Sequence, residues 1–218
     1  MVRSSIVALT IGCVALLSID LEAHTRAGRH TFDIVATVSR DVITPPQAAA
    51  MVAEVNRIWL RAAVRVIWTN GPLLLPSSAL NVSVYIDDRL RLPCPEDVQP
   101  LGAVTRIDGE IQPAIFVSRS AIHRLMESAG VRRVGDPFDF LYGRLVGRVV
   151  AHELGHLLLE SDEHRSFGLM RPRFRTSDVT TSDTQPFGIH GNDLAMIRRQ
   201  LTAQTLLARA RRDRSPAR

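Results

Sequence analysis

The chain of 218 residues contains no lysine, so all 27 of its basic residues are arginine. A complete replacement of one cation by the other is typical of a coding bias and not of a selected binding face. The arginines are scattered except in segment 209–218, which lacks the interleaved aromatic residues that stack on nucleic-acid bases. The net charge of +5 therefore does not predict nucleic-acid binding. We interpret segment 209–218 as a basic disordered tail.

Cysteine is almost absent, with only Cys13 and Cys94 in the chain. Residues 1–23 combine a basic start, an apolar stretch and a small residue, Ala23, at the position where a signal peptidase would cleave. This is the pattern of a secretory signal peptide. The apolar stretch is shorter than the roughly 20 residues that span a bilayer, and no other segment is long and apolar enough. We expect cleavage after Ala23 and a secreted or periplasmic location. Cys94 would then have no disulfide partner within the chain.

The remaining residues, 24–208, suit a single domain. Thr44 and Pro45 can begin an amphipathic helix, Asp108-Gly109 is a strong hairpin signal, and Asp136 can cap a long helix. The predicted strands are 31–38, 64–68, 80–86, 101–107 and 111–117, and the predicted helices are 46–63, 136–160 and 192–210, the last two separated by a loop. This order predicts an α+β fold with a mixed, twisted sheet of about five strands covered by a helix.

The long predicted helix contains the pattern H-E-x-x-H, formed by His152, Glu153 and His156. Histidines four residues apart lie on one face of a helix, where both imidazoles can hold one Zn²⁺ ion. Glu153 can reach a zinc-activated water and act as the general base for peptide hydrolysis. A chance match on an ordinary helix is the alternative, but capping and periodicity predict this helix independently, which favours the metal site.

A catalytic zinc site needs a third protein ligand. No glutamate follows Glu163, which excludes a glutamate ligand from a later helix. The candidates that remain are Asp162, His164, Asp178, Asp183, His190 and Asp193. We prefer His164, because imidazole suits zinc and a short turn could return it to the metal. Asp162 is the second choice and His190 the third.

The segment from His152 through Leu159, followed by His164 and by Gly168-Leu169-Met170, resembles the metzincin metallopeptidases. That group carries H-E-x-x-H-x-x-G-x-x-H and a methionine-containing turn beneath the zinc. The resemblance implies that His152, His156 and His164 are ligands, that Glu153 is the base and that Met170 is the turn methionine. It also implies a zincin-like fold, in which a strand of hairpin 101–117 pairs with an extended peptide substrate.

The chain departs from the metzincin pattern at three points. Leu159 stands where the pattern has the glycine of a sharp turn, and a leucine in a left-handed conformation would be strained. His164 comes two residues later than the third histidine of the pattern, and Asp162 occupies that position. No tyrosine follows Met170, which excludes a tyrosine ligand from that region.

The functional hypothesis is a secreted zinc endopeptidase, expected to be a monomer that acts on extended peptides. The alternative is a zinc-stabilised, non-catalytic exported binding protein. A basic nucleic-acid-associated protein is a third hypothesis. We interpret Cys94 as a loop thiol, His24, His30 and His123 as solvated side chains, and Trp59 and Trp68 as core residues.

Overall fold

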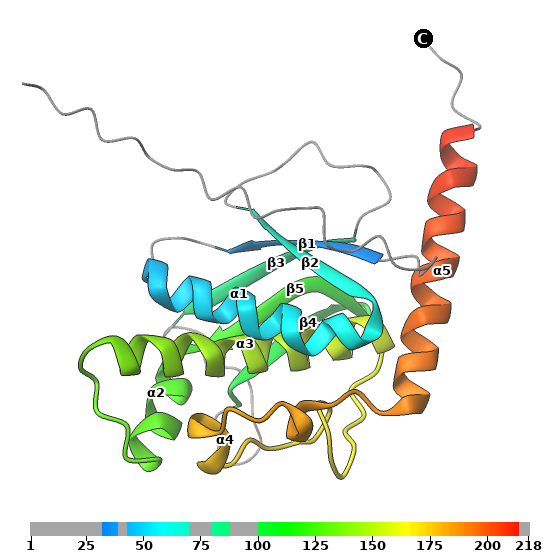
Figure 1. Ribbon diagram of the computed structural model, residues 1–218. Coiled ribbons are helices and arrows are strands. Elements are labelled where there is room, and N and C mark those ends of the chain that lie inside the picture. The colour runs from blue at the N-terminus through cyan, green and yellow to red at the C-terminus, as the bar shows by residue number, and fades with distance from the viewer. Residues whose placement is uncertain (1–31, 39–42, 70–79, 88–99, 214–218) are drawn as a thin grey trace, which may run out of the picture.

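The computed structural model describes residues 32–38, 43–69, 80–87 and 100–213, with side chains described up to residue 206. A five-stranded sheet lies on two long helices, as Figure 1 shows. The predicted signal peptide, His24, His30 and Cys94 lie outside the described residues. The interpretations of those residues therefore remain predictions.

The sheet is mixed, and its strand order is β2-β1-β3-β5-β4. Its strands are β1 (Phe32–Val38), β2 (Val64–Thr69), β3 (Leu80–Asp87), β4 (Gly102–Ile107) and β5 (Glu110–Ser118). Neighbouring strands are parallel except for the hairpin pair β4 and β5, which is antiparallel. The predicted α+β class with a mixed five-stranded sheet is confirmed. The antiparallel strand β4 forms one edge of the sheet.

Helix α1 (Pro45–Trp59) begins with a capping box, in which the side chains of Thr44 and Gln47 bond each other's backbone N–H groups. The regular helix is shorter than the predicted 46–63. A 3-10 turn, η2 (Leu60–Ala62), follows it, and Ala63 then adopts a left-handed conformation with φ 56°. This turn directs the chain straight into β2.

Helix α3 (Asp136–Leu159) is the longest element under the sheet. The prediction that Asp136 caps it is wrong. Gly135 occupies the cap position with φ 79°, and no side chain caps the helix. Asp136 and Asp139 instead lie in the first turn, where their charges complement the positive end of the helix dipole.

Helices α1 and α3 pack closely at Gly143 and Gly147 of α3. These positions need glycine, because a Cβ atom on either residue would collide with the α1 backbone. Beside this contact, Arg148 of α3 donates a hydrogen bond of 2.6 Å to Glu54 of α1. The Arg148 and Glu54 side chains are only 0% and 3% exposed. The two helices are therefore joined by a buried ion pair as well as by apolar packing.

The remaining helices are α2 (Arg119–Ser128), the short α4 (Ser177–Thr180), the 3-10 turn η3 (Gln185–Phe187) and α5 (Gly191–Asp213). Helix α5 stands beside the sheet and extends beyond it in Figure 1. It includes residues 209–213, which we expected to be disordered, whereas 214–218 lie outside the description. None of the described helices is both long and apolar enough to cross a bilayer.

The structure places the two tryptophans predicted for the core and the histidine predicted for the surface at different degrees of burial. Trp59 is fully buried and Trp68 packs against the core while partly buried. His123 is not simply solvated: its ring is half-buried and stacks on Phe138 and Tyr142, with centroids 5.8 and 5.1 Å away. Phe138 and Tyr142 belong to α3 and face His123 of α2. This contact could not be predicted from the sequence pattern of either helix alone.

Candidate metal centre

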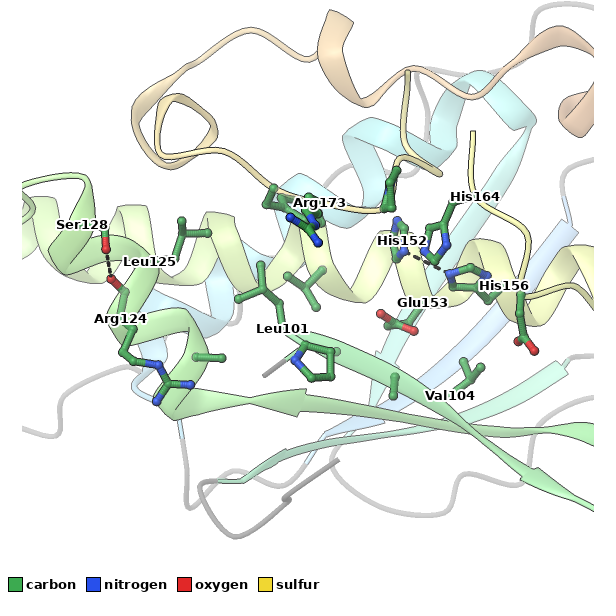
Figure 2. A pocket seen from close by; sticks show the side chains of 18 residues that line it. Leu101, Val104, Arg124, Leu125, Ser128, His152, Glu153, His156, His164 and Arg173 are labelled. Atoms are coloured by element: carbon green, nitrogen blue, oxygen red, sulfur yellow. Dashed lines mark hydrogen bonds between the residues drawn. The ribbon is translucent and has the colours of Figure 1, made fainter. Parts of the chain in front are cut away.

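Three histidines, His152, His156 and His164, converge beside α3 and are called the histidine cluster below (Figure 2). Their possible ligand atoms all lie within 4.8 Å of one another. The Nε2 atoms of His152 and His156 are 3.0 Å apart, and the His164 ring stacks on the His152 ring with centroids 5.3 Å apart. Among the described residues, this is the group of His, Cys, Asp and Glu side chains that could hold a metal ion.

Backbone carbonyls orient two rings of the histidine cluster. The Nδ1 atom of His152 lies 2.7 Å from the carbonyl oxygen of Leu169, and the Nδ1 atom of His156 lies 2.7 Å from that of Ser161. Because a carbonyl oxygen only accepts, each Nδ1 must carry the proton. In the neutral rings the two Nε2 lone pairs are then free and close together. Donation of Nδ1–H to a backbone carbonyl is the outer-shell arrangement found in metal-binding histidines.

This arrangement fits zinc. Two opposed lone pairs at 3.0 Å repel unless a proton or a cation lies between them. Nitrogens bound tetrahedrally at roughly 2.0–2.1 Å from Zn²⁺ would be about 3.3 Å apart, close to the observed separation. Imidazole nitrogens are also ligands that zinc prefers.

The histidines are held in the neutral form that binds metals. Burial lowers the pKa of His152 to about 4, against the opposing effect of its hydrogen bond to Leu169. Burial also lowers the pKa values of His156 and His164. Unprotonated nitrogens are therefore available at neutral pH.

Glu153 lies next to the histidine cluster and close to Gly102 of strand β4 (Figure 2). The side chain is buried, and burial, together with the nearby charge of Asp162, raises the pKa of its carboxyl to about 8. A Cβ atom on Gly102 would lie 2.8 Å from Glu153 Oε1, so a glycine is needed for this strand to pass so near. A carboxyl with a pKa near neutrality can both accept and return a proton.

A tight turn formed by Gly168, Leu169 and Met170 contacts His152 of the histidine cluster and the helix α3 that carries it. Gly168 has φ 80°, Leu169 supplies the carbonyl that orients His152, and Met170 is buried. A Cβ atom on Gly155 would overlap the Met170 sulfur, so the thioether packs directly on the helix between His152 and His156. Met170 therefore contacts α3 at Gly155, a contact that was not predicted from the sequence, and its role as a turn methionine beneath a metal stays a prediction.

The structure explains the departure at Leu159. Leu159 stays in the helix and is buried, and the left-handed residue is Glu160, with φ 49°. The N–H of Ser161 bonds the carbonyl of His156, and the N–H of Glu160 approaches that of Leu157, which is the Schellman type of helix end. The left-handed residue therefore comes one residue later than the glycine of the metzincin pattern. The chain after it folds back and places His164 beside His152 and His156.

The other candidate ligands have different partners. Asp162 is 67% exposed and pairs with Arg106 of β4 at 2.7 Å. His190 contacts the Phe167 ring at 5.5 Å. The carboxylates of Asp178, Asp183 and Asp193 are bonded to Arg171, to the backbone N–H of Gln185 and to Arg165 respectively. The structure thus brings His164, and none of these residues, into the group with His152 and His156.

The histidine cluster and Glu153 line one end of a pocket of about 830 Å³, called the histidine pocket below. In Figure 2 it runs from the histidines to Arg124, Leu125 and Ser128 of α2, along Leu101 and Val104. Arg173 also lines the pocket. These residues of α2 and segment 172–174 could not be predicted from the sequence, because they carry no motif and come together only through the fold.

No family model matches the chain, and no curated protein matches it. Among solved structures, the archaemetzincin of Methanopyrus kandleri is similar, at 14% sequence identity and a TM-score of 0.47. The similarity covers 79% of this chain and 96% of the archaemetzincin chain. At this identity and TM-score the likeness carries no inference about function.

Proposed function

We propose that this protein is a zinc-dependent endopeptidase. The observation that supports the proposal best is the convergence of three neutral histidines beside the buried Glu153 carboxyl in an open pocket. A purely structural zinc site has four protein ligands and no use for an adjacent buried carboxyl, whereas a catalytic site has three ligands and an open position.

Each residue has a separate role in this proposal. His152, His156 and His164 hold the metal through their nitrogens, and the Leu169 and Ser161 carbonyls keep two of the rings in the required orientation. Bound zinc would lower the pKa of water towards roughly 7 and polarise a carbonyl group. Glu153, buried beside the histidine cluster, takes a proton from the attacking water and returns it to the leaving amine.

Strand β4 supports an extended peptide as the substrate. It is an edge strand of the sheet, and its residues Gly102 to Val104, with the preceding Leu101, line the histidine pocket. An extended peptide can add to such an edge through main-chain hydrogen bonds, which places a peptide bond beside Glu153. The ion pair between Arg106 and Asp162 ties the far end of β4 to the loop that carries His164.

Zinc content and peptide cleavage, measured on the same preparations, test the proposal. We expect about one zinc per wild-type chain and cleavage of casein or a peptide library. Glu153→Gln should keep the zinc and lose roughly 10²- to 10⁴-fold in kcat/KM. His152→Ala should lose both, whereas His190→Ala serves as the matched histidine control and should lose neither.

Two results would contradict the proposal. Failure of the wild type to retain zinc would exclude the metal site itself. Zinc retained without cleavage by either the wild type or Glu153→Gln would favour a non-catalytic zinc-stabilised binding protein.

Export is part of the same proposal and is supported by the pattern of residues 1–23. N-terminal sequencing of protein recovered from the periplasm or the medium should find His24 as the first residue. Recovery of the chain only from the cytosol, with Met1 retained, would exclude export.

A further inference from the structure

Asp193 is a buried carboxylate that the proposed mechanism does not use. It lies in the first turn of α5, and its side chain is 1% exposed. Arg165 donates to it as a fork, from Nη2 to Oδ1 at 2.8 Å and from Nε to the two oxygens at 3.3 and 3.4 Å. Because a buried carboxylate without a charged partner is costly, Asp193 holds the Arg165 side chain against α5.

Helix α5 is a firm anchor for this ion pair. Ile197 and Leu201, about one and two helical turns after Asp193, are buried in the apolar core. The positive end of the helix dipole also stabilises a carboxylate in the first turn. The place of the Asp193 carboxylate is therefore determined by the core and not by the histidine cluster.

Arg165 directly follows His164 in the chain, and its backbone is held as well as its side chain. The N–H of Arg165 donates to the carbonyl of Met170 at 2.7 Å, which closes the loop across its base. Arg165 is thus bound at two points, by the Met170 turn and by α5. Since a single peptide unit joins Arg165 to His164, these bonds restrict where the His164 imidazole can lie.

We infer that Arg165 and Asp193 are positioning residues of the metal centre, and that their ion pair holds His164 where it can complete the ligand set. This inference rests on the proposed zinc site and adds the residues that organise its third ligand. A purely structural role, in which the pair only attaches α5 to the rest of the fold, is the alternative. The two roles differ in whether loss of the pair acts through His164.

Zinc affinities of single and double variants, measured by competition with a chelator, separate the two roles. Arg165→Gln should weaken zinc binding on the order of tenfold, as the loss of an outer-shell partner does, and Asp193→Asn should reproduce this effect. In the His164→Ala background Arg165→Gln should change the zinc affinity little, because the ligand that it positions is gone. Arg165→Lys should recover part of the affinity, since the charge remains while the fork is lost.

Glu163→Gln is the matched control. The Glu163 carboxylate lies 3.4 Å from the same Arg165 guanidinium, but its side chain is 76% exposed. An exposed pair of this kind contributes little, so Glu163→Gln should bind zinc as tightly as the wild type does.

Cobalt substitution gives a readout that a purely structural role would not change. Co²⁺ can be bound by the same imidazole ligands as Zn²⁺, and its visible absorption bands change with the number and geometry of the ligands. The spectrum of cobalt-loaded Arg165→Gln should shift from that of the wild type towards that of His164→Ala. Circular dichroism of the metal-free proteins verifies that each variant is folded, and Arg165→Gln carries the test if Asp193→Asn does not fold.

Each possible failure has a distinct meaning. A wild type that binds neither zinc nor cobalt would overturn both the metal site and this inference. Wild-type zinc affinity and an unchanged cobalt spectrum in Arg165→Gln would overturn the positioning role and leave the peptidase function intact. An equal loss of zinc affinity from Arg165→Gln with and without His164 would show that the pair supports the fold in general and not this ligand.

Discussion

At the scale of single residues, His164 and Asp162 compete for the position of third ligand. They are two residues apart in one loop, but their surroundings differ. The His164 ring stacks on His152 within the histidine cluster, whereas the Asp162 carboxylate is paired with Arg106 and is mostly exposed. The environment of each side chain, and not its distance along the chain from His152, separates the two candidates.

Substitution of each residue tests this assignment. His164→Ala removes one of three proposed ligands and should weaken zinc binding by at least about 100-fold, more than the loss of an outer-shell partner. Asp162→Asn keeps the shape of the side chain and should change zinc affinity by about tenfold or less. Competition with a chromogenic chelator measures both constants. A larger loss in Asp162→Asn than in His164→Ala would make Asp162 the ligand.

Gly102 controls the distance between β4 and the Glu153 carboxyl. A Cβ atom there would lie 2.6 Å from Val149 Cγ1 and 2.8 Å from Glu153 Oε1. Gly102→Ala should therefore displace the strand or the carboxyl, lower kcat/KM by about 10- to 100-fold and cost about 1–3 kcal/mol of stability. In Gly191→Ala the new Cβ meets nothing within 4 Å, so both quantities should stay near wild type. Full activity of Gly102→Ala would contradict the close approach.

The residues differ in how far their roles follow from sequence. The spacing of His152, Glu153 and His156 within a helix is a local property, so the sequence predicts their common face. The environments of Gly102 and Gly155 are not predictable in this way, because each depends on a residue brought close by a different element. The same holds for His123, whose aromatic neighbours lie on α3.

At the scale of elements, α3 joins the core to the site. One face packs on α1 and holds the buried Arg148, and another carries the histidines. The Arg148 guanidinium also donates to the backbone carbonyls of Asp178 and Thr181, and it lies 4.3 Å from the centroid of the Phe187 ring. The Arg148 side chain therefore connects α3 with α1 and with segment 178–181, which follows the Met170 turn.

Removal of this guanidinium should be costly. Arg148→Met removes the buried partner of the Glu54 carboxylate and leaves it only the more exposed Arg57, so it should destabilise the protein by about 3 kcal/mol. Arg65→Gln is the control: it breaks the exposed ion pair with Asp33 and should cost less than about 1 kcal/mol. Denaturant unfolding at neutral pH measures both changes. Similar losses of unfolding free energy in the two variants would mean that the buried Arg148–Glu54 pair does not stabilise the contact between α1 and α3.

The elements themselves show which structural information is local. The capping box at Thr44 and the Asp108-Gly109 hairpin were predictable because neighbouring residues determine them. The order of the five strands and the turns α4 and η3 were not. The strand order depends on pairing between distant segments, and long-range bonds such as those from Arg144 and Arg148 hold the predicted loop in a defined shape.

At the scale of the whole molecule, the metal centre lies at the boundary between two parts. The sheet and helices α1, α2, α3 and α5 share a continuous apolar core that reaches Leu169 and Met170 but includes no proposed ligand. The loop from Ser161 to Gly168 carries His164 outside that core, between the Ser161 and Leu169 carbonyls that bond His156 and His152. The core should therefore fold without zinc, whereas the loop should be ordered by it.

Zinc removal should consequently lower stability without unfolding the chain. At free zinc 100-fold above its Kd, binding to the native state alone contributes about 2.7 kcal/mol. In a domain of this size that corresponds to a fall in Tm of about 5–10 °C on chelation, reversible when zinc is added back. Differential scanning calorimetry and far-UV circular dichroism, with and without a chelator, measure the shift and the retained secondary structure. The Tm of His164→Ala should respond far less to chelation, because its zinc affinity is already weakened. Complete loss of helical signal on chelation would show instead that the metal is required for the core, and an unchanged Tm in the wild type would show that zinc does not bind the native fold.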